Sequence, residues 1–169
     1  MVDLIPVRKL YKYESLQRID HPDGRKYIYG EQRLPSVTTI LSSTKDKSGL
    51  EAWAAKVGAE NAEKIKNKAA NIGTHMHSVI ERMIAYRDLP RPTNWEMTVG
   101  YEMGYRLVNT FFSNLDEVWG SEVALYYPEK YAGTTDLVGV YRGKPAIIDF
   151  KQSNKPKKKE WINDYFHQL

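Results

Sequence analysis

The chain has 169 residues, of which 41% are hydrophobic and 27% are charged, the composition of a globular protein with its own core. Its formal net charge of +4 is a mild basic excess, which permits a polyanionic partner without demonstrating one. The absence of cysteine excludes disulfides, thiolate zinc sites and Cys-ligated iron–sulfur clusters. No apolar run reaches about 18 residues and no signal-peptide segment is seen, so we expect no membrane span and a cytoplasmic location.

The first quarter of the chain predicts a β-hairpin followed by a short helix. A strong turn signal at residues 21–24 lies among alternating aromatic and polar residues, so we expect residues 11–18 to pair with residues 26–31. Ser36 is a candidate N-cap, and the helix that it begins is expected to end near Ser43.

Two helical stretches are expected next. Residues 50–86 have a helical pattern with weak points at Gly58 and Gly73, and residues 95–115 predict a second long helix. The two prolines within residues 88–93 predict a linker between these helices.

The last third of the chain predicts a small sheet. Strands are expected at residues 118–127, 134–141 and 145–152, and another helix begins at Trp161. Helices that precede a small sheet indicate an α/β (α+β) fold, which we expect to form one domain over residues 1–169. Its expected parts are the hairpin and short helix at 1–48, the helical region at 49–116, and the sheet with the start of the following helix at 117–169.

Two aspartates and a lysine lie in the last two expected strands. If Arg142-Gly143 is a two-residue loop, Asp136 falls directly opposite Asp149, with their Cβ atoms about 5 Å apart. Lys151 then shares the face of Asp149. Two carboxylates this close repel each other unless a cation or a proton separates them, and their oxygens suit Mg²⁺ or Mn²⁺. The alternative is that each acid belongs to an ordinary solvated charge pair.

A second group of candidate residues lies on the first long helix. Hydrophobic residues with helical spacing predict one buried stripe there. His77 and Glu81 are four residues apart at one edge of the stripe, where core meets solvent, and His75 falls at the opposite edge. A surface His–Glu pair is the alternative interpretation. The stripe comprises Met76, Val79, Ile80, Met83 and Ile84.

Two further charged features have open interpretations. Glu122, on the strand before Asp136, is either a solvated edge residue or a member of the same site. A basic cluster that follows the last strand is either a solvated loop or a set of contacts to phosphates. The cluster consists of Lys155, Lys157, Lys158 and Lys159.

In combination, these segments resemble the PD-(D/E)xK nuclease superfamily, and within it the RecB-like exonucleases. The matching segments are, in chain order, Gly73-Thr74 with His77 and Glu81, then Gly133-Thr134-Thr135-Asp136, then Asp149-Phe150-Lys151. Residues 34–41, Leu-Pro-Ser-Val-Thr-Thr-Ile-Leu, look like a segment of the mitochondrial genome maintenance exonuclease group, which are single-strand DNA exonucleases with phage and bacterial relatives.

The resemblance implies a restriction-endonuclease-like core, a small mixed sheet flanked by helices, that acts as a metal-dependent exonuclease. Single-stranded DNA would be the substrate, in replication, repair or recombination, and Mg²⁺ or Mn²⁺ the cofactor. The setting would be a bacterial or phage-infected cell. The implied metal ligands are His77, Asp136, Asp149 and the backbone carbonyl of Phe150.

The resemblance also implies roles for residues around the metal. Lys151 would position and activate the attacking water, and Glu81 would hold His77 or a water molecule. Gln168 matches the first position of the family's Q-x-x-x-Y motif. The chain ends at Leu169, before the tyrosine of that motif, so we expect a truncated or split protein.

Three other functions fit parts of the pattern. One is a non-catalytic nucleic-acid-binding module on a nuclease fold, and another is a structure-specific endonuclease of the same superfamily. The third is a metal-binding domain unrelated to nucleic acid. The sequence gives no indication of the oligomeric state.

Overall fold

The computed structural model describes residues 5–89, 91–153, 156–159 and 162–168 of the chain. The chain forms two compact units, each assembled from segments that are far apart in the sequence. We call them the helical unit and the sheet unit and describe each by itself. The helical unit comprises Met1–Ile5, Asp46–Asp116 and Phe150–Asn154, and the sheet unit comprises Pro6–Lys45, Glu117–Asp149 and Lys155–Leu169. That the whole chain acts as one nuclease domain stays a prediction.

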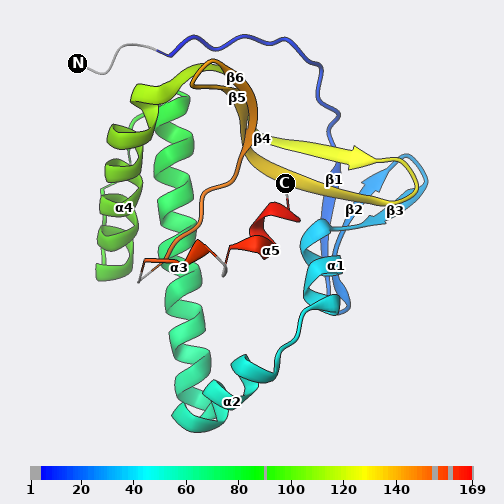
Figure 1. Cartoon of the computed structure of the whole chain (residues 1–169), viewed down its shortest axis with the longest axis vertical. Coiled ribbons are helices and arrows are strands. Elements are labelled where there is room, and N and C mark those ends of the chain that lie inside the picture. Colours follow the sequence, from blue (N-terminus) through cyan, green and yellow to red (C-terminus); the bar gives the residue numbers. More distant parts are fainter. Residues whose placement is uncertain (1–4, 90, 154–155, 160–161, 169) are drawn as a thin grey trace. The chain divides into compact units, whose positions relative to one another are not determined.

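The helical unit is built on two long helices that lie side by side (Figure 1). Helix α2 (Ser48–Val57) leads into α3 (Ala59–Ile84), and α4 (Trp95–Phe111) continues into the 3₁₀ turn η1 (Phe112–Asn114). Gly58 ends α2, as predicted, whereas α3 continues through Gly73 without a break. The predicted stripe is buried at Met76, Val79, Ile80 and Ile84.

Helices α3 and α4 approach closely because α4 carries two glycines where it meets α3. A Cβ added at Gly100 would lie 2.6 Å from the His75 Cβ, and one added at Gly104 would lie 2.9 Å from the carbonyl oxygen of Met76. Both positions on α4 are buried. The turns of α3 from Ile72 to Val79 are therefore held against the backbone of α4.

The segment after the last strand returns to the helical unit. Phe150 is 5% exposed, and its ring meets the ring of Phe111 edge-on, with centroids 5.5 Å apart. Two residues further on, the Cβ of Gln152 lies 4.0 Å from the position that a Cβ would occupy at Gly73. The aromatic contact anchors Phe150 at the end of α4, and Gln152 lies beside α3.

The sheet unit contains two three-stranded sheets. The first has the order β1 (Gln17–His21), β2 (Gly24–Tyr29) and β3 (Gln32–Pro35). The predicted hairpin is present, with its first turn at Pro22-Asp23, but its first strand is wrong for residues 11–16, since only Gln17 and Arg18 of the predicted range 11–18 pair with β2. The ladder instead runs from Gln17↔Ile28 to His21↔Gly24.

Residues 7–13, before β1, contact β4 instead of pairing with β2, which explains why they do not form the first strand of the hairpin. The ring of Tyr11 lies 5.7 Å from that of Trp119 and 6.3 Å from that of Tyr13. Val7 forms a bridge with Val118 of β4. The aromatic alternation of this segment therefore reflects packing along β4 and not a strand of the hairpin.

Helix α1 (Val37–Thr44) follows β3 directly and agrees closely with the predicted short helix. The Ser36 side chain accepts a hydrogen bond from the Thr39 backbone N–H at 3.0 Å, which is the predicted N-cap. Tyr27, Leu34 and Ala132 form a small core between the first sheet and β5. The phenolic oxygen of Tyr27 lies 3.0 Å from the Thr134 Oγ1.

The second sheet has the order β4 (Leu115–Tyr127), β5 (Tyr131–Tyr141) and β6 (Lys144–Ile148) (Figure 1). Strand β5 is central and most deeply buried at Ala132 and Leu137, which are both 0% exposed. Gly139 of β5 faces the Glu117 carbonyl of β4 so closely that a side chain would collide with that backbone. A short helix, α5 (Asn163–Phe166), lies near the end of the chain, and Trp161, where we expected it to begin, is outside the described residues.

The two units differ in charge. The sheet unit contains 15 Lys and Arg residues against 11 Asp and Glu residues, which accounts for the whole net charge of +4. The helical unit contains ten of each and is formally neutral. The net positive charge that could attract a polyanion therefore lies in the sheet unit.

Candidate metal centre

The β5–β6 hairpin determines where the two aspartates of the candidate site lie. Tyr141 pairs with Lys144 across the loop Arg142-Gly143, and both loop residues have positive φ, at 50° and 74°. This is the predicted two-residue loop, in the geometry of a tight hairpin turn. The ladder continues to Leu137↔Ile148, so Asp136 and Asp149 are the next residues beyond its last pair.

The end of β6 differs from the prediction. We expected a strand over residues 145–152 with Asp149 and Lys151 on one face, but β6 ends at Ile148. The hydroxyl of Thr135 donates a hydrogen bond to the Ile148 carbonyl at 3.3 Å, which satisfies that last carbonyl. The chain then leaves the sheet, because Phe150 is buried against Phe111.

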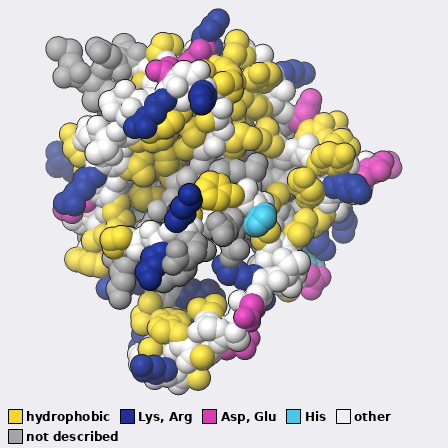
Figure 2. Space-filling model, in the orientation of Figure 1, with side chains coloured by type: hydrophobic (Ala, Val, Ile, Leu, Met, Phe, Trp, Pro, Cys, Tyr) yellow, Lys and Arg dark blue, Asp and Glu magenta, His cyan; other side chains and the backbone are white. Residues whose placement is uncertain are grey.

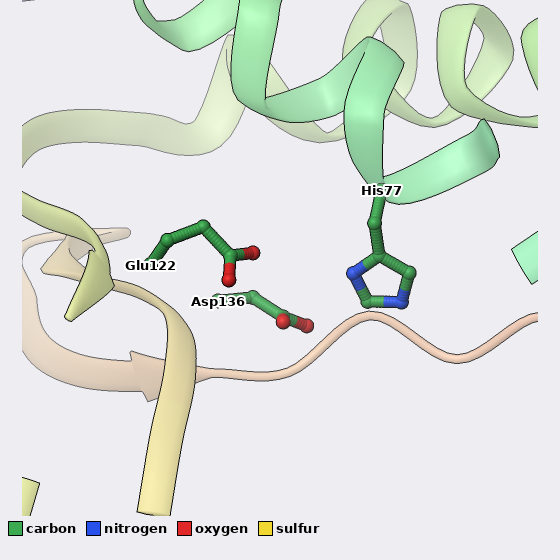
Figure 3. Close-up of side chains that lie close together, drawn as sticks. All are labelled: His77, Glu122 and Asp136. Carbon is green, nitrogen blue, oxygen red and sulfur yellow. The ribbon is translucent and has the colours of Figure 1, made fainter. Parts of the chain in front are cut away.

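The second carboxylate next to Asp136 is that of Glu122, from β4. Ligand oxygens of the two residues lie within 4.8 Å of one another. Figure 3 draws the side chains of Glu122, from β4, and Asp136, from β5, next to each other, with their carboxyl groups extending to the same side. Asp149 does not join this close pair, since among the described residues it does not lie within that distance of both carboxylates.

Glu122 lies next to Asp136 although its backbone departs from regular strand geometry. Its φ of 51° falls in the left-handed region, which residues other than glycine seldom adopt. An irregular residue of this kind within a strand bends it and redirects a side chain. From the sequence, only the position of Glu122 on the strand before Asp136 indicates a place in the site. That position does not distinguish a metal ligand from a solvated edge residue.

The carboxylate pair fits a divalent cation. Two oxygens that bind one Mg²⁺ at about 2.1 Å can be up to about 4.2 Å apart, and Ca²⁺ allows slightly more. Ligand oxygens of Glu122 and Asp136 lie within 4.8 Å of one another, which is compatible with both residues binding one such ion. Carboxylate oxygens are the ligands that Mg²⁺ and Mn²⁺ prefer.

Helix α3 carries the candidate nitrogen ligand. His77 and Glu81 are both partly buried and one turn apart, at the edge of the buried stripe, as predicted. His75 is directed toward α4, where its Cβ would touch a side chain at Gly100. The two histidines are therefore on different sides of α3, and His77, drawn with the carboxylates in Figure 3, is the one with a ligand role in our prediction.

Lys151 and Gln152 lie in the helical unit beside the same helix. Lys151 is exposed, between the buried Phe150 and the partly buried Gln152. Gln152, the residue after Lys151, lies beside Gly73, which is one turn before His77, so residues 150–152 and helix α3 meet within the helical unit. Asp149 belongs to the sheet unit.

The remaining predicted residues lie near the end of the chain. Lys157, Lys158 and Lys159 are exposed, and Lys155 lies outside the described residues. Gln168 is partly buried, in the turn after α5, and its backbone N–H donates to the Tyr165 carbonyl at 3.1 Å. On the face drawn in Figure 2, Lys and Arg side chains are dispersed among hydrophobic ones and do not form one continuous patch.

Within the described part of the chain, no helix has the length and hydropathy that crossing a bilayer requires.

Comparison with known proteins relates the chain to exonucleases. It is 31% identical over 141 residues to mitochondrial genome maintenance exonuclease 1 of Xenopus tropicalis, a match that covers 79% of this chain and 39% of that protein. Proteins of the same name from Mus musculus and Homo sapiens are 29% and 28% identical, over 73% of the chain in each case. No protein-family model matches the chain.

The chain spans about two fifths of the length of these relatives. The similarity supports a relationship to an exonuclease family, in agreement with the resemblance inferred from the motifs.

Proposed function

We propose that the chain carries the catalytic site of a metal-dependent DNA exonuclease of the PD-(D/E)xK, RecB-like type, with single-stranded DNA as its substrate. The observation that carries this proposal is the register of the β5–β6 hairpin, which ends in Asp136 and Asp149, together with the Glu122 carboxylate beside Asp136. The similarity to proteins named as exonucleases supports the same reaction. In metal-dependent hydrolysis of a phosphodiester, such carboxylates hold the cations that stabilise the charge on the phosphate.

The proposed metal ligands come from four parts of the sequence. Asp136 and Asp149 supply oxygens, with Glu122 as an additional oxygen ligand that the structure suggests. His77 supplies a nitrogen, and the carbonyl of Phe150 supplies a further oxygen. These donors suit Mg²⁺ or Mn²⁺. When bound, the cation would stabilise the negative charge that develops on the phosphate during hydrolysis.

Other residues act on the water and on the substrate. The Lys151 ammonium group positions the attacking water and adds positive charge on the attacking side. Glu81, one turn from His77, holds the imidazole or a water molecule. Gln168 takes part from the end of the chain. A role of Lys155, Lys157, Lys158 and Lys159 in binding the phosphates of the strand agrees with the net positive charge of the sheet unit.

The predicted cellular setting, a bacterial or phage-infected cell, rests on the family resemblance alone. The relatives carry a name that refers to mitochondria. Replication, repair or recombination is the process in which we place the reaction.

Substitution of the Asp-x-Lys residues tests this function. Asp149→Ala and Lys151→Ala are each expected to lower Mg²⁺-dependent release of nucleotides from labelled linear single-stranded DNA by about a hundredfold or more, because each removes a charge that acts in the transition state. Lys144→Ala, at an exposed position at the start of β6, is the matched control and should cleave like the wild type. Circular dichroism checks that all variants are folded.

Three results would contradict the proposal in different ways. Near wild-type activity in Asp149→Ala or Lys151→Ala would refute the site. Binding of DNA by the wild type without cleavage in Mg²⁺ or Mn²⁺ would indicate a non-catalytic module. Cleavage of closed circular single strands would indicate an endonuclease.

A further inference from the structure

Gly73 lies inside a regular helix where nothing in the described structure requires a glycine. It is the fifteenth residue of the 26-residue helix α3, far from either end. Its φ is not in the left-handed region that glycine favours. Glycine in a helix interior lowers stability relative to alanine, because it loses more backbone freedom on folding. A cost of this kind calls for a compensating role.

Close packing, the usual role, does not apply at Gly73. Among the described residues, only the Cβ of Gln152 comes as near as 4.0 Å to the position of an added Cβ, and this is an ordinary van der Waals contact. At Gly100 and Gly104 of the neighbouring helix, by contrast, added Cβ atoms would come within 2.6–2.9 Å of α3. The glycines of α4 are therefore explained by packing, whereas the described residues make no such close contact at Gly73.

The neighbours of Gly73 indicate which ligand could lie against the helix at this position. It precedes His77 by four residues, so the two lie on the same side of α3. Gln152, which follows Lys151, lies against the same place. Gly73 is partly exposed, Gln152 lies beside it, and His77 follows one turn later. A glycine at this position lets a ligand approach the helix backbone closely.

We infer that Gly73 makes room for the sugar–phosphate backbone of the substrate strand, next to the group being hydrolysed. This inference rests on the proposed function, since it takes a single strand of DNA as the ligand and His77 and Lys151 as neighbours in the site. A methyl group at position 73 would keep the strand about one carbon radius away from the helix. Gly73 is on this account a substrate-positioning residue.

Gly73→Ala tests the inference because stability and binding should move in opposite directions. The variant should melt about 2–4 °C higher than the wild type, since alanine is the better helix residue. Its dissociation constant for a fluorescein-labelled oligothymidylate, measured by anisotropy in Ca²⁺ and in EDTA, should rise at least fivefold. Gly49→Ala, at a helical glycine with nothing within 4 Å, is the matched control and should bind like the wild type.

Two results would overturn the inference. One is unchanged DNA affinity in Gly73→Ala. The other is a lower melting temperature, which would show that the glycine serves packing. Failure of the proposed function has a different signature: a wild-type chain that binds the oligonucleotide but does not cleave it in Mg²⁺ would refute catalysis, while weaker binding by Gly73→Ala would still support the strand contact.

Discussion

The sheet unit and the helical unit hold their candidate site residues by different means. In the sheet unit, strand register determines the positions of Asp136 and Asp149, because a slip of one residue would turn Asp136 to the other face of β5. In the helical unit, His77 depends on the close packing of α3 against Gly100 and Gly104. The carboxylates therefore depend on a hydrogen-bonded ladder, and the imidazole depends on the volume of the side chains between two helices.

This difference predicts which substitutions damage each unit. The sheet unit should be most sensitive to loss of side-chain volume at its buried central strand. The helical unit should be most sensitive to added volume between its helices. Each of the next two predictions tests one side of the comparison.

Removal of a core side chain from the sheet unit should have the larger effect. Leu137 is 0% exposed and pairs with Ile148 next to the carboxylates. Leu137→Ala should lower the free energy of unfolding by about 2–5 kcal/mol, because it loses buried apolar surface and leaves a cavity. Urea unfolding followed by circular dichroism measures the change. A loss below about 1 kcal/mol would show that strand pairing, and not the buried leucine, stabilises this unit.

Addition of one methyl group between the helices should have a smaller effect. Gly104→Ala should lower the free energy of unfolding by about 1–3 kcal/mol, because the new Cβ would lie 2.9 Å from the Met76 carbonyl oxygen and cannot be accommodated without a shift of the backbone. The same urea titration measures it, with Gly49→Ala as the control for the intrinsic effect of alanine in a helix. Equal or greater stability of Gly104→Ala would contradict the close-packing account.

The parts of the fold that were predictable are those in which a local signal and the long-range structure agree. The Arg142-Gly143 loop gave the register of the β5–β6 hairpin because a two-residue turn permits few alternatives. The N-cap at Ser36 and the weak point at Gly58, where α2 ends, were predicted because serine and glycine have strong local preferences at helix ends. The first sheet was less predictable, since the alternation at Tyr11 and Tyr13 arises from ring contacts with Trp119 and each other.

Parts of the candidate site depend on contacts that a local pattern does not contain. Nothing in the sequence around Glu122 indicates its positive φ, so its place beside Asp136 could not be assigned. The end of β6 at Ile148 follows from the burial of Phe150 against a ring 39 positions away in the sequence. The contact between Gln152 and the position of Gly73 likewise joins segments that no local pattern connects.

The central claim is that the carboxylates of the sheet unit bind a divalent cation, and calorimetric titration with Mn²⁺ tests it most directly. The wild type should bind Mn²⁺, and Asp136→Asn should bind it at least about tenfold more weakly, because a ligand oxygen loses its charge. Lys151→Met, which removes a proposed catalytic group but no ligand, should retain wild-type affinity. Absence of Mn²⁺ binding by the wild type, or wild-type affinity in Asp136→Asn, would contradict the account.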